Sequence, residues 1–450
     1  MEPPTPQSPF DRSVEWIKQS ITLKLFAIGF LMLLLLIPLE MVQDLIWERE
    51  RLQNQVVNDI SSTWAKGQLL YGPILSIPYD EIAVVENHLG ENNEVKVRKT
   101  AHFLPEYLSI DGKLDSEKRH RGIYEVTVYS SQNKISGFFN QPDLSHWPGQ
   151  KEVFWDQSTL SYGLSDLRGV QEIISIDWNS SNLSFNPGSE LAPFLGNGVS
   201  VPVPLDISDS NKKYNFDISL ELNGSGYLLV VPLGKETKVN LSGNWPDPKF
   251  SGAFLTDTSQ VDATSFEAEW KILNLNRSFP QQFTAIPENI DQSAFGVELL
   301  IPVDEYQKNT RSAKYAILLI SLTFIAFFFI QLLNKIRVHP IQYILVGLAL
   351  CLFYLLLLSL SEHIGFYKAY LIAALAVILQ ITFYVKALLK SWKLSAWVFG
   401  IIGSLYAFIY IIIQEDEYSL LMGSIGLFLV LGLMMYLSRK VDWYSLRKSE

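Results

Sequence analysis

Five apolar runs follow one another in the C-terminal third of the chain, and none of them contains Asp, Glu, Lys or Arg. A helix needs about 20 apolar residues to cross roughly 30 Å of bilayer hydrocarbon. The buried helices of a soluble protein do not come as five such runs in succession. The sequence therefore predicts five membrane-spanning helices, at residues 315–334, 341–361, 369–385, 394–414 and 418–438.

Another apolar segment, residues 25–42, lies near the N-terminus and is interrupted by Pro38 and Glu40. In a cleaved signal peptide, small residues would follow the apolar core. Here large apolar residues and an acidic residue follow it instead. We interpret this segment as a retained transmembrane signal anchor. It is preceded by a tail over residues 1–24 and brings the number of predicted helices in the bundle to six.

The short loops carry an uneven distribution of Lys and Arg, and this distribution sets the orientation of a membrane protein. Twelve of these residues lie in residues 1–24, in the loops after the second and fourth helices, and in the tail over residues 439–450. With six helices these segments share one side, whereas the opposite short loops carry only Lys368. We therefore expect both termini in the cytoplasm and residues 43–314 outside it.

The outer segment divides into a helical stalk at about residues 43–64, a β-rich part at 65–304 and a linker at 305–314. Apolar residues occupy every second position from Tyr214 to Leu222, which is typical of an antiparallel strand with one solvated face. Short strands separated by Gly, Pro and Asn predict a β-sandwich or two packed β lobes. In the second case, residues 188–198 are the candidate boundary between the lobes.

Composition limits the chemistry of the outer segment. Cys351 is the only cysteine and lies in an apolar run, so the β-rich part folds without an intrachain disulfide. The formal net charge is −10, which argues against binding to nucleic acid. The lipid bilayer is the one partner that the apolar runs themselves imply.

Sequence motifs of known catalysts are missing. The chain has no GxSxG, HExxH, Walker A or GxGxxG motif, and none of its six histidines lies at metal-ligand spacing from another or from Cys351. We therefore predict no catalytic, cofactor-binding or metal-ligating residue. We also expect the protein not to be an enzyme.

Polar residues at the ends of two predicted helices form the one candidate site. Glu362 and His363 follow Ser361 at the outer end of the third helix, and Glu40 lies near the outer end of the first. Because charge at membrane depth is costly, such residues often have a function. One hypothesis is a hydrogen-bonded or proton-sensitive cluster at the outer membrane interface. The alternative is that these residues only mark the end of a span.

Several stretches of mixed polarity give the chain a family resemblance. They are Gly72-Pro73-Ile74-Leu75-Ser76-Ile77-Pro78, Phe103-Leu104-Pro105-Glu106, Asp166-Leu167-Arg168-Gly169, Ser242-Gly243-Asn244-Trp245-Pro246, Arg311-Ser312-Ala313-Lys314-Tyr315, His339-Pro340-Ile341-Gln342-Tyr343, Ser361-Glu362-His363 and Asp442-Trp443-Tyr444. With them the chain resembles the CreD family of cell envelope integrity proteins over nearly its whole length. The resemblance implies a bacterial inner membrane location and a periplasmic outer domain. It also implies a role in envelope integrity and the envelope stress response, with expression tied to a two-component system.

Three functions remain open at this point. The first is a non-enzymatic protein of the cell envelope whose periplasmic β domain binds an envelope component or a partner protein. The second is a transporter or flippase-like protein that works through the helical bundle. The third is a periplasmic hydrolase that carries no recognised motif.

Overall fold

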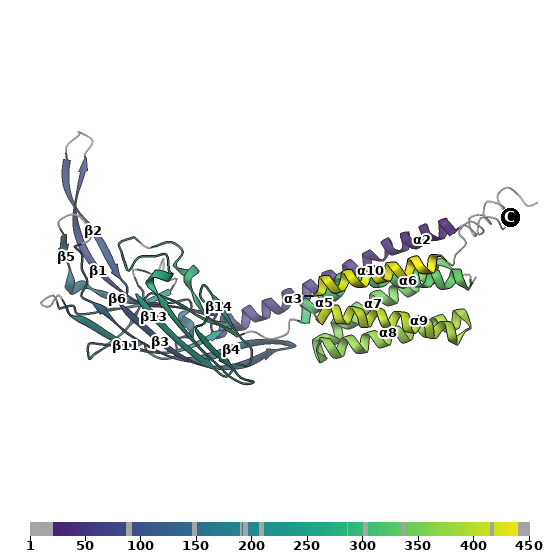
Figure 1. Ribbon diagram of the computed structural model, residues 1–450. Coiled ribbons are helices and arrows are strands. Elements are labelled where there is room, and N and C mark those ends of the chain that lie inside the picture. Colours follow the sequence, from purple (N-terminus) through teal and green to yellow (C-terminus); the bar gives the residue numbers. More distant parts are fainter. Residues whose placement is uncertain are drawn as a thin grey trace, which may run out of the picture. The chain divides into compact units, whose positions relative to one another are not determined.

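The computed structural model (Figure 1) describes residues 21–86, 92–145, 151–189, 191, 197–206, 211–285, 287–299, 305–334, 336, 338–414 and 418–439. The chain forms two units. One is Gln53–Pro302, and the other is Met1–Leu52 together with Val303–Glu450.

Among the described residues, five segments are long and apolar enough to cross a membrane, and all lie in the helical unit except residues 53–64 of the first. They are Lys24–Trp64, Glu305–Leu333, Pro340–Ile364, Phe366–Leu389 and Trp392–Gln414. The first segment consists of α2 (Ile21–Leu34) and α3 (Leu36–Trp64), and the second of α5 (Glu305–Lys314) and α6 (Ala316–Leu333). The others are α7 (Pro340–Ile364), α8 (Phe366–Leu389) and α9 (Trp392–Gln414).

Two predicted segments differ from the structure in detail. The sixth predicted span, residues 418–438, coincides with α10 (Ser419–Ser438), whose apolar stretch among the described residues, Leu421–Tyr436, is shorter than the others. The predicted linker, residues 305–314, is the helix α5. The predicted stalk, at about residues 43–64, lies within α3.

Local sequence explains where α7 begins and ends. His339 precedes the helix, and its Nδ1 accepts a hydrogen bond from the backbone amide of Ile341 at 3.3 Å. The Gln342 side chain returns the interaction by accepting from the His339 amide at 2.8 Å, and Pro340 occupies the first helical position. Gly365 ends the helix with φ 78°, a backbone conformation that favours glycine.

Aromatic side chains hold α7, α8 and α9 together. The Phe353 ring of α7 lies 5.3 Å from the Tyr370 ring of α8 and 4.7 Å from the Tyr406 ring of α9, measured between ring centroids. The Tyr370 hydroxyl also donates to the Tyr406 carbonyl oxygen at 2.8 Å. This satisfies two polar groups that would be costly to bury alone. The three helices are therefore joined by packing and by a buried hydrogen bond.

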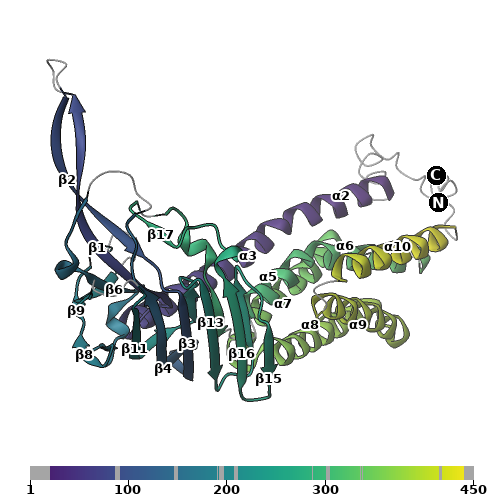
Figure 2. The same ribbon diagram turned by 60° about the vertical axis from the view of Figure 1, so that its left-hand side comes forward.

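The other unit is built from two β-sheets, and Figure 2 shows the second of them with its strands side by side. The first sheet has the order β14-β18-β12-β1-β6-β10-β9, with β2 and β5 also on β1 and β17 on β2. Its strands are β1 (Gln68–Glu86), β2 (Asn92–Phe103), β5 (Lys151–Val153), β6 (Thr159–Leu164), β9 (Asn186–Pro187), β10 (Asn197–Pro202), β12 (Tyr227–Val231), β14 (Pro248–Gly252), β17 (Gln282–Phe283) and β18 (Phe295–Leu299).

The second sheet has the order β15-β16-β13-β3-β4-β11-β7-β8. Its strands are β3 (Tyr107–Arg121), β4 (Tyr124–Asn140), β7 (Ser175–Trp178), β8 (Ser181–Ser184), β11 (Lys213–Ser225), β13 (Glu236–Gly243), β15 (Thr258–Val261) and β16 (Phe266–Leu273). Most neighbours are antiparallel, but β1 pairs with β12, and β3 with β13, in parallel.

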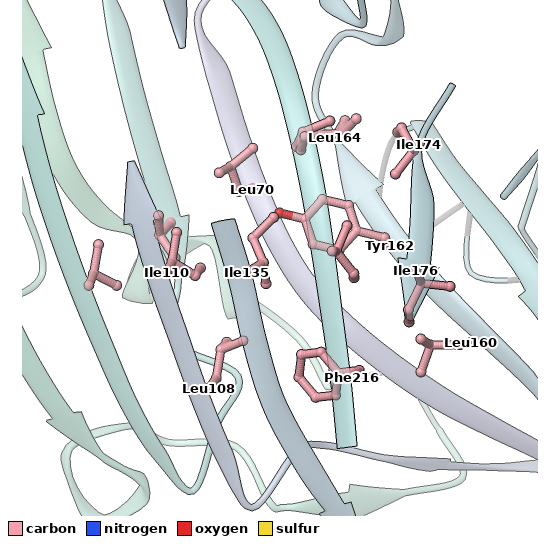
Figure 3. Packing of buried hydrophobic residues seen from close by; sticks show 14 of the residues in the cluster. Leu70, Leu108, Ile110, Ile135, Leu160, Tyr162, Leu164, Ile174, Ile176 and Phe216 are labelled. Carbon is pink, nitrogen blue, oxygen red and sulfur yellow. The ribbon is translucent and has the colours of Figure 1, made fainter. Parts of the chain in front are cut away.

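One hydrophobic core lies between the two sheets. Figure 3 shows Leu70 and Tyr162 of the first sheet beside Ile110, Ile135 and Phe216 of the second. The alternation predicted from Tyr214 to Leu222 is confirmed, because each apolar residue of that stretch is buried. The unit is therefore a sandwich rather than two lobes. The candidate boundary at residues 188–198 was wrong, since the Gly188 amide donates to the Gly198 carbonyl within the first sheet.

A buried carboxylate joins the end of α3 to the sandwich. Asp166 is 6% exposed and accepts hydrogen bonds from the Lys66 amide at 3.1 Å and from the Arg168 guanidinium. Gln68 adds two more bonds across the same region, to the Asp166 and Asn223 carbonyl oxygens at 2.9 and 3.1 Å. A Cβ at Gly169 would lie 2.2 Å from the Asn223 carbonyl oxygen, so only glycine fits there.

Candidate functional site

Glu362 lies in the last turn of α7, where α3 and α5 also contribute side chains. The Tyr306 hydroxyl of α5 donates to Glu362 Oε1 at 2.9 Å, and Arg49 Nε of α3 lies 3.8 Å from the same oxygen. The Glu362 side chain is only 11% exposed. The phenol and the guanidinium thus compensate a carboxylate that would otherwise be costly to bury.

A second contact joins the same two helices one turn further along α5. Asn309 Nδ2 donates to Ser361 Oγ at 2.8 Å and to the Glu305 carbonyl oxygen at 2.8 Å. The Ser361 hydroxyl in turn donates to the Leu358 carbonyl oxygen. Asn309 and Ser361 are both buried. We call the group of Arg49, Tyr306, Asn309, Ser361 and Glu362 the Glu362 cluster.

Of the three residues that the sequence placed in this site, the structure brings only Glu362 into the cluster. Glu40 is exposed on α3, and His363 is exposed beside an open hollow with Lys368, Leu371 and Ile372. Among the described residues, no hydrogen bond or ion pair joins Glu40 or His363 to Glu362. The hypothesis of a cluster that includes all three is therefore revised to one centred on Glu362.

Sequence reasoning missed Tyr306, Asn309 and Arg49. It assigned α5 to a linker and gave Arg49, within the predicted stalk, no role. A signal was present in α5, because Tyr306, Asn309 and Ser312 recur at intervals of three residues and all three are buried. Residues at this spacing share one face of a helix.

A separate polar hollow lies on the outward face of the second sheet of the sandwich, with a volume of about 500 Å³. Its outward side chains come from β3, β4, β11 and β13, and they are Asp111, Lys113, Gln132, Lys134, Ser219, Glu221, Asn240 and Ser242. We call this feature the sheet hollow. Two hydrogen bonds order it, from Asn240 Nδ2 to Asp111 Oδ1 at 2.7 Å and from Gln132 Nε2 to Glu221 Oε1 at 3.3 Å.

The comparison with known proteins decides the family. The family model described as "Inner membrane protein CreD" matches residues 20–444, which is nearly the whole chain. The chain belongs to the CreD family. It is also 34% identical over 435 residues to the Inner membrane protein CreD of Escherichia coli (strain K12), and the match covers 95% of each chain. The resemblance inferred from the sequence is confirmed, and the five apolar segments agree with a membrane location.

The stretches that suggested the CreD family hold structural contacts in this chain. Asp166, Arg168 and Gly169 form the connection between α3 and the sandwich. His339 and Pro340 begin α7. Glu362 anchors the Glu362 cluster. In this chain, three of these stretches therefore lie where a helix begins, contacts another helix or continues into the sandwich.

One pair of side chains in this CreD-family protein resembles part of a hydrolytic site. The Ser76 hydroxyl lies 2.9 Å from His102 Nδ1, on neighbouring strands of the first sheet. Both residues are buried, and burial lowers the pKa of His102 to about 4. No carboxylate hydrogen bond to His102 occurs among the described residues. Burial and the low pKa make this pair a poor general base for a substrate in solution.

Within the ranges that the structure describes, no group of three or more His, Cys, Asp or Glu residues is arranged to hold a metal ion.

Proposed function

We propose that this CreD-family protein maintains the integrity of the cell envelope and takes part in the envelope stress response. In this proposal the sandwich binds an envelope component or partner protein without catalysis, and the helices anchor it in the inner membrane. The observation that carries the proposal is the sheet hollow, a polar concavity of about 500 Å³ on a two-sheet unit carried by a membrane protein. The proposal also includes control of this protein's expression by a two-component system.

The proposed topology has six spans, cytoplasmic termini and a periplasmic sandwich between the first and second spans. The distribution of Lys and Arg in the short loops supports it. So does the element order, in which α3 precedes β1 and α5 follows β18. A sandwich on the cytoplasmic side would require the basic segment before the first span, residues 1–24, to lie outside the cytoplasm.

A complementation scan tests the proposed function. In a strain that lacks the protein, the full chain would carry single alanine substitutions at each Ser, Thr, His, Asp, Glu and Lys between Lys66 and Asp304. Survival would be measured under detergent and cell-wall stress, with protein levels checked by immunoblot. Graded losses that cluster on the outward face of the second sheet support binding, because binding energy is spread over several contacts.

The same scan separates binding from catalysis. Removing a true nucleophile or general base costs orders of magnitude in rate. Complete loss at two or three adjacent titratable residues, with normal abundance, would contradict the proposal and indicate an enzyme. A sandwich that tolerates every substitution would contradict binding through the sandwich and would favour transport through the helices.

A further inference from the structure

The sheet hollow belongs to a longer row of outward side chains on the second sheet. Burial alternates along β3, so that Tyr107, Ser109, Asp111 and Lys113 face outward while the residues that alternate with them are buried. On β4, Phe138 lies opposite Tyr107, and Gln132 lies opposite Lys113. The aromatic pair and the hollow thus share one face. They are separated by four residues of β3, or roughly 13 Å.

The charges in the sheet hollow balance one another. Asp111 and Glu221 supply two carboxylates, and Lys113 and Lys134 supply two ammonium groups. Lys134 is also 3.5 Å from the neighbouring carboxylate of Asp217. A site for a polyanion such as nucleic acid needs an excess of cations, which the sheet hollow does not have.

Two other classes of ligand fit the face poorly. A peptide that extends a sheet requires an unpaired strand edge. In contrast, β13, β3, β4 and β11 each have a neighbour on both sides. An apolar small molecule requires an enclosed pocket that buries most of its surface, whereas the sheet hollow is open and its outward side chains are charged, amide or hydroxyl groups.

The row offers both kinds of contact that a polyhydroxylated chain can use. Carboxylate, amide and hydroxyl side chains can accept from and donate to neighbouring sugar hydroxyls. The Tyr107 and Phe138 rings, 6.4 Å apart and inclined by 21°, provide an apolar surface for the C–H face of a sugar ring. The Lys213 ammonium lies over the Phe138 ring at 4.6 Å from its centre, and the Lys238 ammonium lies over the Tyr107 ring at 5.9 Å, so each ring has a hydrogen-bond donor next to it.

We propose that this face binds a polysaccharide strand, with sugar rings resting on Tyr107 and Phe138 and their hydroxyls bonded in the sheet hollow. The proposal rests on the proposed function, because it names the class of envelope component that the sandwich would bind. The separation of the two subsites requires a ligand longer than one sugar ring.

The test uses the full chain in lipid nanodiscs, because detergents with sugar headgroups carry the chemistry under test. Titration calorimetry measures binding of soluble β-linked oligomers of N-acetylglucosamine, β-linked oligomers of glucose, and polyglutamate. We expect both sugar polymers or the acetamido polymer alone to bind, and polyglutamate not to bind. Preference for the acetamido polymer points to an amino-sugar strand of the cell wall. Equal binding of both sugars points to a general glucan.

Matched variants locate the site. Asn240→Ala, Gln132→Ala and Phe138→Leu should each weaken binding about fivefold to tenfold. Asn182→Ala is the control, since Asn182 Nδ2 donates to Asp177 Oδ1 at 3.0 Å on β8 of the same sheet but outside the sheet hollow. Its affinity should stay within about twofold of the unchanged protein. Gln132 and Asn182 are exposed, so their variants are expected to fold, and melting curves check this.

The outcomes separate this inference from the proposed function. Absence of sugar binding, preference for polyglutamate, or equal loss in Asn182→Ala and Asn240→Ala would overturn the polysaccharide assignment. If the same hollow variants then still failed to complement the strain under stress, the proposed function would stand with a different ligand. Sugar binding that the hollow variants weaken, together with their loss of complementation, supports both.

Discussion

Arg168 donates two hydrogen bonds to the Asp166 carboxylate, from Nε to Oδ1 at 2.9 Å and from Nη2 to Oδ2 at 2.7 Å. The same carboxylate accepts from the Lys66 amide, two residues after α3 ends. One charged pair therefore fixes the place where the chain leaves the long helix and enters β1. Such bidentate pairs are among the stronger polar contacts in proteins.

Asp166→Asn should lower the free energy of unfolding of the sandwich at neutral pH by about 2 kcal/mol. Hydrogen bonds from Arg168 lower the Asp166 pKa from 3.8 to about 2, so its contribution is complete above pH 4 and is lost as the pH falls to 2. Chemical denaturation at several pH values between 4 and 2 measures this loss of unfolding free energy. Asp217→Asn is the control, because the Lys134–Asp217 pair is exposed and should contribute little. Equal losses in the two variants would contradict the prediction.

His102 should make the sandwich less stable as the pH falls below neutrality. Burial lowers its pKa from 6.5 to about 4, so the folded protein binds this proton later than the unfolded chain does. The contribution of neutral His102 to the unfolding free energy is complete above pH 6.5 and is lost as the pH falls to 4. The total loss is about 3 kcal/mol. His102→Gln keeps a polar partner for Ser76 and cannot be charged. Its melting temperature should change less between pH 7 and pH 4.5 than that of the unchanged protein.

Glu362→Gln should weaken envelope function while abundance and topology stay normal. Glutamine can still accept from Tyr306, but it no longer carries the charge that faces Arg49. His363→Ala, at the adjacent exposed position, should complement fully and serves as the control. Full complementation by the double variant Glu362→Gln, His363→Ala would contradict the prediction. It would show that these residues only mark the end of the helix.

Reporter fusions test the proposed topology. Fusions after Lys66, Glu362 and Glu417 should report a periplasmic location, and fusions after Arg337, Lys390 and Glu450 a cytoplasmic one. The physical reason is the excess of Lys and Arg on one side of the short loops. A cytoplasmic signal at Lys66 would refute the whole arrangement.

The sandwich should fold as a separate soluble fragment, and its stability should depend on the end of α3. A fragment over residues 66–304 should be mostly β by circular dichroism. A fragment that starts at Gln53 should be more stable by about 2 kcal/mol. It regains Trp64, whose Nε1 donates to the Tyr129 carbonyl at 3.4 Å and whose ring lies 3.8 Å from the Arg119 guanidinium. Trp64→Ala in the longer fragment should remove most of this gain, and a helical spectrum would contradict the strand assignment.

Local periodicity explains which parts of this fold the sequence could predict. The alternation in β11 and β16 follows from neighbouring residues alone, and it matches their burial. The parallel pairing of β1 with β12 could not be predicted in this way, because register depends on a partner far along the chain. For the same reason, only part of the Glu362 cluster could be predicted from the sequence. Glu362 stood out by its position at the end of an apolar run, but Arg49 and Tyr306 come from elements that are distant in sequence.

The parallel pairing of β1 with β12 also sets the order in which the sandwich can form. Leu70 pairs with Val230, and β12 pairs in turn with β18, so the first sheet stays incomplete until residue 299 is available. At about 5–20 residues per second of synthesis, β1 waits roughly 8–30 s for β12. During this time residues 68–71 of β1 lack their partners in β12, which leaves this part of the strand open to chaperones. Substitutions in β12 or β18 should therefore reduce the yield of folded protein more than equally buried substitutions in the β3–β4 hairpin, whose strands are neighbours in sequence.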